Sequence, residues 1–491
     1  MSRRLHGIIA ALAVVFACFA FLGSRGLNEP DEGRYAEIAR EMVATGDWLV
    51  PHLNGFPHFQ KPPLLYWFTA ASLAMFGSSE WAVRLPSALA ALGTLGLTFW
   101  MTRTLLGRTA AWCAALALFS SVGFFVLARL LTPDMLMTFW ITAALACLVR
   151  VSRGGSAPWA WAFFAAMGFG FLTKGPMALV VPISGALGLR WAMARQGSKL
   201  ALPWAAGLAL ALAIGLSWFV ALALSSHELF HYFWHDELLN RFASRAHGRS
   251  QPFWFFVPVI AAGLLPWAWF LPGLVRDGWR RLGSERPLSP LHGLMLGWLV
   301  PPFVVLSLSG SKLSTYVLPL LPALALLLAW WWKRNGFPLR RVAACSGIAV
   351  ATWLALCSQL DRFNDLLGAQ ASIRPLVETL RRQPDLHTAT IFACGVRVHS
   401  LEYYLGAPVT VTRGEADVVL PPMSAQNSRL MDSATACEEA MSRLPVAYGV
   451  LREKDAAKYF PPDRWRSLAR VGRYLLVARE PVPEMVTQVV R

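Results

Sequence analysis

The chain has 491 residues, of which 56% are hydrophobic and only 15% are charged, and its net charge is +17. A water-soluble protein of this length needs more charged side chains, so the composition excludes an ordinary soluble domain. The positive charges lie in short loops between apolar stretches, which argues against nucleic-acid binding. The apolar stretches, many of about 18 residues or more, predict a polytopic α-helical membrane protein.

In chain order, the apolar stretches predict about eleven membrane spans, thirteen at most. They lie at residues 5–24, 82–102, 109–128, 135–149, 158–173, 176–194, 201–224, 253–274, 290–308, 315–332 and 342–359. With the N-terminus in the cytoplasm, every inside loop is basic, as the positive-inside rule requires. The basic residues of these loops are Arg103, Arg108, Arg150, Arg153, Arg190, Arg195, Lys199, Arg276, Arg280, Arg281, Arg286, Lys333, Arg334, Arg340 and Arg341. This topology leaves two long loops, 25–81 and 225–252, and the C-terminus outside.

The first outside loop begins with an acidic stretch, "NEPDEGRYAEIAREM", at residues 28–42. Its pattern predicts a helix from about Asp31, with Glu37 and Glu41 on a solvated face in intrahelical ion pairs. Its apolar positions are expected to lie along the membrane surface: Tyr35, Ile38, Ala39 and Met42. Asp31, Glu32 and Arg34 sit where a membrane-embedded cavity would open, so they are candidate site residues.

The same loop ends in "PHFQKPPLLYWF", at residues 57–68. Pro62 restricts Lys61 to an extended conformation and stiffens the segment that follows. A fixed ammonium beside an aromatic belt suits a lipid phosphate. The alternative is a lysine that reaches along the apolar surface to the membrane interface.

The other polar residues of the outside face lie mostly at span ends. They are Asp134, Lys174, Arg241, Arg245, Lys312 and Tyr316. Singly, Asp134 could cap a helix and Lys312 could reach to the interface. Charged groups at membrane depth are costly, however, and indicate function by default. Together, these residues predict one site that takes an anionic substrate from the outer face of the membrane.

The chain after the last span differs from the rest. Residues 360–491 are more polar, with a helix pattern in "RPLVETLRRQ" and strand patterns in "TATIFACGV", "PVTVT", "ADVVLP" and "YLLVARE". The sequence therefore predicts a transmembrane domain at 1–359 and a small α/β domain outside the membrane at 360–491. No nucleotide-binding phosphate loop is visible, and we expect a lipid-linked phosphate donor and no separate cofactor.

Several of these motifs carry a family resemblance. The first-loop pattern, "RLPSAL" from Arg84, "LTPDM", "LTKGP" and "SKLSTYVLPLLPALALL" together resemble the bacterial lipid A aminoarabinose transferases. That family is part of the protein O-mannosyltransferase-like group of GT-C fold glycosyltransferases. The resemblance runs in order over about residues 5–335, and the last third of the chain is not diagnostic.

The resemblance implies a fold, an activity and site residues. It implies an inner-membrane enzyme of GT-C type whose active site and C-terminal domain are periplasmic, with a polyprenyl-phosphate sugar as donor and a lipid A phosphate as acceptor. The family's first-loop aspartate falls on Asp31 and its second on Asp134, which we expect to be catalytic. Its phosphate-contacting lysine falls on Lys61, with Arg245 and Tyr316 as helpers. Glu32, Arg34, Lys174, Arg241 and Lys312 are expected to bind substrate.

The chain also departs from the family pattern. Gln60 stands where well-known members have Glu, and the Glu-His pair of the second long loop is replaced by Glu237–Leu238. The missing Glu and His are metal-associated positions, so the sequence predicts no metal by that route. His231 and His235 lie nearby, but no complete ligand set is evident.

The acceptor decides the expected chemistry of Asp31. A lipid A phosphate is already anionic, so Asp31 would orient the sugar or stabilise its developing positive charge. A hydroxyl acceptor would need a base, and Asp31 is then the best candidate. The main rival is a related transferase of a hexosamine or hexose to lipid A, protein or glycan. A sugar-lipid transporter is disfavoured, because the chain shows no internal repeat and its polar residues gather at one face.

Overall fold

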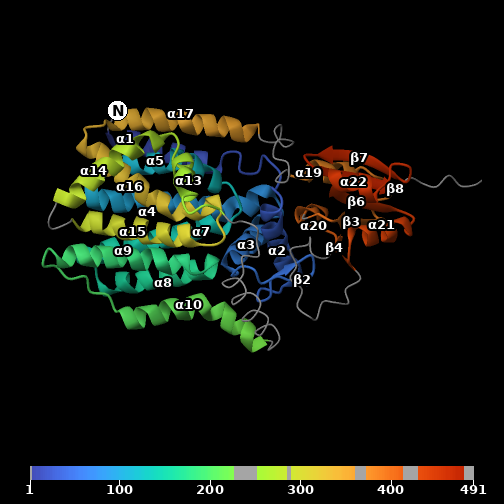
Figure 1. The fold of residues 1–491 in the computed structure, drawn as a ribbon, viewed down its shortest axis with the longest axis horizontal. Helices are drawn as coiled ribbons and strands as arrows, with labels where there is room; N and C mark the ends of the chain where they lie inside the picture. The colour runs from blue at the N-terminus through green and yellow to red at the C-terminus, as the bar shows by residue number, and fades with distance from the viewer. Residues whose placement is uncertain are drawn as a thin grey trace, which may run out of the picture. The chain divides into compact units, whose positions relative to one another are not determined.

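The structure, a computed structural model, describes residues 3–225, 251–284, 289–359, 372–396, 398–412 and 429–479. The chain forms two compact units (Figure 1), a helical unit of Met1–Ser24 with Phe59–Ser358 and a mixed unit of Arg25–His58 with Gln359–Arg491. The sequence-based boundaries kept residues 25–81 together as one loop of the membrane domain. The structure divides this segment at His58, because its first half packs with the C-terminal region.

The helical unit consists of long apolar helices with short breaks. Its elements are α1 (Arg3–Phe19), α3 (Leu64–Phe76), α4 (Glu80–Leu106), α5 (Arg108–Ser120), α6 (Val122–Leu127), α7 (Pro133–Ser152), α8 (Ala157–Lys174), α9 (Met177–Ala194), α10 (Trp204–Ser225), α13 (Phe256–Gly263), the 3₁₀ helix η2 (Trp267–Phe270), α14 (Leu271–Ser284), α15 (Pro290–Leu308), the 3₁₀ helix η3 (Ser314–Leu320), α16 (Leu321–Arg334) and α17 (Leu339–Ser358). Within the described residues, 7 helices are long and apolar enough to cross a membrane, or up to 8 if one bent pair counts as a span. A polytopic helical membrane protein is therefore confirmed, and the count of eleven spans stays a prediction.

The bent pair corrects the predicted span at 253–274. Phe256–Gly263 and Trp267–Arg280 meet at 117°, so the chain turns within the apolar run instead of continuing straight. Pro266 stands at the break, and proline cannot continue the helical hydrogen-bond ladder. Hydropathy does not register this turn, because the residues on both sides remain apolar.

Small residues allow helices α9 and α15 to pack closely against each other. A Cβ at Gly188 would lie 2.2 Å from the carbonyl oxygen of Gly293, and one at Gly297 would lie 2.1 Å from that of Ser184. Larger residues would force the backbones apart, as is typical of membrane helix pairs that pack through glycine. The buried core of the unit joins α7, α8, α9 and α15 around Trp298.

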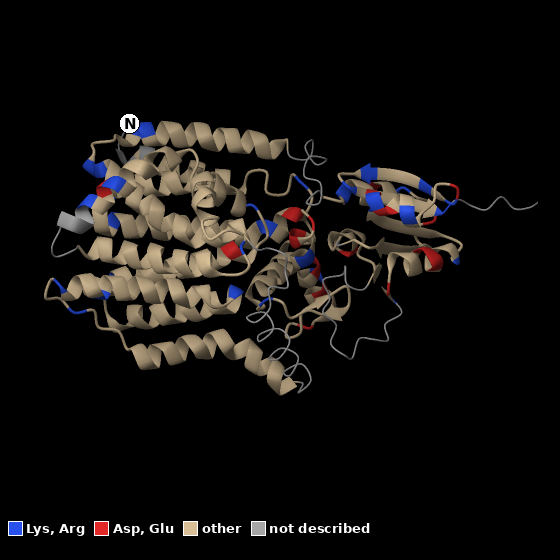
Figure 2. Ribbon diagram, viewed as in Figure 1, with Lys and Arg blue, Asp and Glu red and all other residues tan. Residues whose placement is uncertain are grey.

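The helical unit has two chemically different ends. At one end, α4, α7 and α16 finish in basic residues: Arg103, Arg150, Lys333 and Arg334. Figure 2 shows Lys and Arg gathered at this end, at the left of the view. Lys333 Nζ donates to the Leu106 carbonyl at 2.8 Å, so the C-termini of α16 and α4 lie together. The opposite end holds the start of α7 with Asp134 and the end of α8 with Lys174.

The mixed unit is built on a six-stranded sheet in the order β5-β4-β3-β6-β8-β7. Its strands are β3 (Thr390–Cys394), β4 (Thr410–Thr412), β5 (Leu430–Met431), β6 (Ala447–Arg452), β7 (Trp465–Val471) and β8 (Tyr474–Arg479). Strands β5, β4, β3 and β6 are parallel, and β8 and β7 continue the sheet antiparallel. Its helices are α19 (Arg374–Arg381), α20 (Ser400–Leu405), α21 (Ala434–Ser442) and α22 (Glu453–Tyr459). The predicted strand "ADVVLP" lies outside the described residues.

The first-loop segment belongs to this mixed unit. It supplies α2 (Asp31–Thr45) and a hairpin of β1 (His52–Leu53) with β2 (Phe56–Pro57). Helix α2 packs against α20, and Gly33 permits the contact, because a Cβ there would lie 2.6 Å from the Ser400 nitrogen. A disulfide joins Cys394 to Cys437. The unit is therefore assembled from two segments that lie more than 300 residues apart in the sequence.

Candidate functional site

Three predicted site residues of the helical unit meet in space, from three separate connections. Asp134 lies in the first turn of α7, and Lys174 is the last residue of α8. The Lys174 ammonium forms an ion pair with Asp134 Oδ1 and lies 4.7 Å from the ring centroid of Tyr316 in η3. The predicted convergence of these three residues is therefore found in the structure.

Helix geometry explains why these two charges are held here. A carboxylate is favoured at a helix N-terminus and an ammonium at a C-terminus, because each complements the helix dipole. Pro133 starts α7 with a φ that suits the first turn. The two side chains are only 5% and 12% exposed, so each charge depends on the other for compensation. The Tyr316 ring adds a cation–π contact with the ammonium.

The two other predicted lysines of the unit are Lys312 and Lys61. Lys312 is buried, with 7% exposure, and its Nζ donates to the Ser309 carbonyl at 2.6 Å. Lys61 is half-buried and precedes Pro62, Pro63 and the start of α3. Arg241 and Arg245 lie outside the described residues, as do His231, His235 and Glu237.

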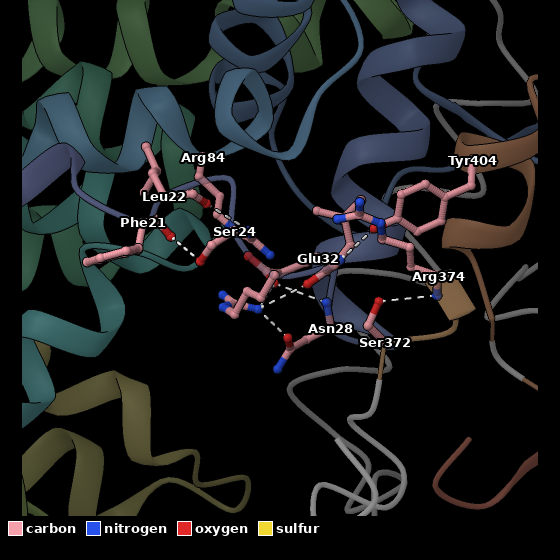
Figure 3. A network of polar contacts seen from close by, with 12 residues as sticks. Phe21, Leu22, Ser24, Asn28, Glu32, Arg84, Ser372, Arg374 and Tyr404 are labelled. Carbon is pink, nitrogen blue, oxygen red and sulfur yellow. Dashed lines mark hydrogen bonds and ion pairs between the residues drawn. The ribbon is translucent and has the colours of Figure 1, made fainter. Parts of the chain in front are cut away.

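Of the two acidic residues at the start of α2, one is exposed and the other is buried. Asp31 is 59% exposed and pairs with Arg34. Glu32 is 2% exposed and accepts hydrogen bonds from Arg25 Nη1 at 2.9 Å and from the Asn28 backbone N–H at 3.0 Å. Figure 3 shows Glu32 turned toward Asn28. Glu32 thus fixes the entry of the chain into α2, while Asp31 keeps a solvent-accessible carboxylate.

The prediction that Glu37 and Glu41 lie on a solvated face of α2 is wrong. Glu37 is fully buried, and its carboxylate is held by Arg40 Nε and Nη2 at 2.8 and 2.7 Å. Glu41 is 6% exposed and accepts the Gly55 N–H at 3.0 Å. The apolar positions expected on the membrane are also buried inside the protein: Tyr35, Ile38, Ala39 and Met42. Both faces of α2 are covered, because the C-terminal segment packs on the side that helical periodicity assigned to water.

Glu37, Glu41 and Glu402 form the carboxylate cluster of the mixed unit. One oxygen from each lies within 4.8 Å of the others, and all three are buried. Burial raises the pKa of Glu37 and of Glu402 to about 7, and burial with the Glu37 charge raises the pKa of Glu41 to about 8. Two arginines work against these increases. Arg40 lies 2.7 Å from Glu37 and Arg429 lies 3.8 Å from Glu402, and each positive charge lowers the pKa of the glutamate beside it.

The oxygen-only donor set of this cluster would suit a hard divalent cation. The raised pKa values mean that a cation would have to displace protons to bind. Arg40 and Arg429 already supply positive charge beside Glu37 and Glu402. We therefore interpret the cluster at neutral pH as a set of carboxyl groups that share protons. These groups hold the two segments of the mixed unit together.

Sequence reasoning missed several buried charged residues. Arg84 is fully buried and donates to the Leu22 carbonyl at 2.9 Å (Figure 3). The Arg129 guanidinium lies 3.6 Å from the Phe125 ring centroid. Glu29 accepts N–H groups of His399 and Ser400 at 3.1 and 2.9 Å. A signal existed for Arg84, since an arginine within an apolar span is costly, but nothing in the sequence links Glu29 to residues some 370 positions away.

Comparison with known proteins gives concordant results. A family model described as dolichyl-phosphate-mannose-protein mannosyltransferase matches residues 60–220. The undecaprenyl phosphate-alpha-4-amino-4-deoxy-L-arabinose arabinosyl transferase 1 of Sodalis glossinidius is 37% identical over 366 residues, which are 72% of this chain and 64% of that relative. The match thus spans less than two thirds of the relative's own length.

Solved structures agree in fold. The apo crystal structure of ArnT from Cupriavidus metallidurans has a TM-score of 0.76 at 24% identity, covering 97% of this chain and 98% of that one. The same protein bound to undecaprenyl phosphate has a TM-score of 0.75 at 24% identity, with 98% of each chain covered. The helical architecture is therefore that of these solved structures. In sequence, the chain is similar to the bacterial aminoarabinose transferases over 366 residues.

Proposed function

We propose that this protein is an integral-membrane glycosyltransferase that moves an amino sugar from a polyprenyl-phosphate donor to a phosphate of lipid A. The observation that carries the proposal is the buried Asp134–Lys174 pair beside Tyr316, built from three connections at one end of an apolar bundle. The relatives' names support the donor and the sugar, since they are undecaprenyl phosphate-aminoarabinose transferases. Undecaprenyl phosphate in the related crystal structure supports a lipid phosphate as leaving group.

The proposed reaction breaks one bond and forms another at the same sugar carbon. The bond between the anomeric carbon and the donor phosphate oxygen breaks, and polyprenyl phosphate departs with the electron pair. An oxygen of the acceptor phosphate forms the new bond to that carbon. Because this acceptor is already anionic, no general base is required. The chain must stabilise the departing phosphate and the positive charge that develops on the sugar.

The proposed roles follow the charges. Lys61 holds the departing phosphate, assisted by Arg245 and Tyr316. We assign Asp31 and Asp134 to the sugar, because a carboxylate stabilises a cationic transition state. Lys174, Lys312 and Arg241 attract the anionic substrates. Glu32 and Arg34 complete the substrate-binding group, with Glu32 held by its ion pair with Arg25 and Arg34 by its ion pair with Asp31.

We further propose that the enzyme lies in the bacterial inner membrane with the mixed unit and the substrate site on the periplasmic side. Two observations support this orientation. The basic helix ends gather at one end of the helical unit (Figure 2), as expected for the cytoplasmic side. The Cys394–Cys437 disulfide suits an oxidising compartment.

A second candidate is a related transferase that carries another sugar, such as a hexosamine or hexose, or uses another acceptor. Two observations favour it. Gln60, beside Lys61, departs from the family pattern. The match also leaves about a third of the relative's length uncovered. Mass spectrometry of lipid A from cells with and without the gene distinguishes the two. Loss of an aminoarabinose mass supports the first candidate, and loss of a hexosamine mass supports the second. Unchanged lipid A under inducing conditions contradicts a lipid A acceptor.

A further inference from the structure

A groove that begins at the basic end of the helical unit has features of a second lipid site. It has a volume of about 700 Å³ and runs between α13, α14, α15 and α16. Its walls are apolar, with Ile260, Phe303 and Leu324 among the lining residues. The guanidinium groups of Arg276 and Arg280 also line it. An apolar channel with cations on its wall matches an amphiphile that has an anionic head and a hydrocarbon tail.

The arginines of the groove lie away from the candidate sugar-transfer site, whereas its apolar walls at Ile260 and Phe303 reach the cluster that contains Tyr316. Trp331 Nε1, near the end of α16, donates to Asp277 Oδ2 of α14 at 2.9 Å, so α14 packs on the basic end of α16. Tyr316, which contacts Lys174, lies in η3, just before the other end of α16. Helix α16 has 14 residues, and a helix rises 1.5 Å per residue, so the arginine end of the groove and Tyr316 are about 20 Å apart.

Helix α14 has the character of a helix that lies in a membrane interface. It follows the 117° turn at Pro266, and it carries Arg276 and Arg280 among large apolar side chains. Val275 and Trp279 are 65% and 77% exposed, and Trp269 just before the helix is 85% exposed. Such exposure is unfavourable in water but is usual at the level of lipid headgroups.

The charge of α14 favours an anionic headgroup over a zwitterionic one. Asp277 is the single acidic residue of α14, and it already accepts from Trp331 and lies 3.3 Å from Arg276 Nε. The Arg276 side chain remains 65% exposed, and Arg280 is exposed as well. Arginine presents a fork of donors that matches phosphate oxygens. Basic pockets between helices on the cytoplasmic side are a known way of selecting anionic lipids.

We propose that this groove binds one anionic phospholipid of the cytoplasmic leaflet, with its phosphate on Arg276 and Arg280 and an acyl chain between α13 and α15. The site fixes α14 to the bundle at the membrane surface. The proposal concerns lipid occupancy and does not require sugar transfer, so each can fail without the other. The leaflet follows from the orientation proposed above.

The test is native mass spectrometry of the full-length protein taken from nanodiscs of phosphatidylglycerol and phosphatidylcholine with identical acyl chains. We expect one retained phosphatidylglycerol in preference to phosphatidylcholine. In the Arg276→Gln/Arg280→Gln variant, binding should weaken roughly 30-fold, because each arginine near a headgroup contributes about 1 kcal/mol. The matched control, Arg340→Gln/Arg341→Gln, removes two exposed charges at the same end and should retain the lipid.

A second variant tests the groove without changing its charge. Val257 lines the groove and is 57% exposed, so Val257→Trp should fill the space of an acyl chain and reduce retention while both arginines remain. Equal retention of the two lipids by the unmodified protein would overturn the proposal. So would equal lipid loss in the groove and control arginine variants, or preferential retention of added polyprenyl phosphate over phosphatidylglycerol.

Discussion

Removing one member of the Asp134–Lys174 pair should cost much more than removing both. In Lys174→Met, the Asp134 carboxylate keeps its 5% exposed position but loses its counter-charge. A buried charge that loses its partner costs about 3–5 kcal/mol. The lost contact with the Tyr316 ring at 4.7 Å adds about 0.5–2 kcal/mol. We therefore expect Lys174→Met to lower the free energy of unfolding by about 3.5–7 kcal/mol.

The double variant Asp134→Leu/Lys174→Met should regain most of that stability. Replacing both partners of a buried pair by apolar residues is often neutral or stabilising. The assay is reversible unfolding of the full-length protein by SDS titration in detergent micelles. Lys333→Met is the control, since Lys333 is exposed and should change stability by less than about 1 kcal/mol. Additive effects of the two single substitutions in the double variant would refute the reasoning. The double variant should stay inactive although it is folded.

Three other predictions concern the mixed unit and the donor site. The raised pKa values of Glu37, Glu41 and Glu402 mean that the folded state binds more protons than the unfolded state between about pH 4.5 and 8. The unfolding temperature should therefore fall as pH rises through this range. In the Glu41→Gln variant it should fall less. Equal pH dependence of the unfolding temperature in the variant and the unmodified protein would exclude the carboxylate cluster as the cause. Lys61→Ala should lower transfer by about 100-fold or more, the loss expected for a group that stabilises charge in the transition state, with an unchanged unfolding temperature; normal turnover would remove Lys61 from the mechanism. Reduction of the Cys394–Cys437 bond, whose cysteines are 43 residues apart, should destabilise the mixed unit by about 4 kcal/mol, measured by hydrogen exchange of β3 and β6, and protection that does not change would contradict this.

The helical unit was largely predictable, because apolar length and the charge of short loops act locally. The same physics led the prediction to Asp134, Lys174 and Tyr316, since polar groups at span ends stand out against an apolar background. It failed at Pro266, where a turn of 117° interrupts a continuous apolar run. It also left the tight pairing of α9 with α15 undetected, because glycine contacts depend on which helices are neighbours.

The role of α2 could not be predicted, because its partners are remote in sequence. Helical periodicity correctly suggested a helix from Asp31. The acidic side was assigned to water because Glu37 and Glu41 are ionisable, and such residues are rarely buried. Burial becomes possible once Arg40, the Gly55 N–H and the shared protons of the carboxylate cluster compensate the charge. That compensation involves Glu402, more than 350 positions downstream.

The central claim, amino-sugar transfer from a lipid phosphate with Asp31 at the reacting sugar, is tested most directly by reconstitution. The purified full-length protein in nanodiscs is mixed with polyprenyl-phosphate aminoarabinose and lipid A, and the products are weighed by mass spectrometry. We predict the mass of one added aminoarabinose on lipid A and equimolar release of polyprenyl phosphate. Asp31→Asn should abolish both with an unchanged unfolding temperature, because Asp31 is 59% exposed and its carboxylate pairs with the neighbouring Arg34. Full activity of Asp31→Asn, or no transfer by the unmodified protein, would contradict the account.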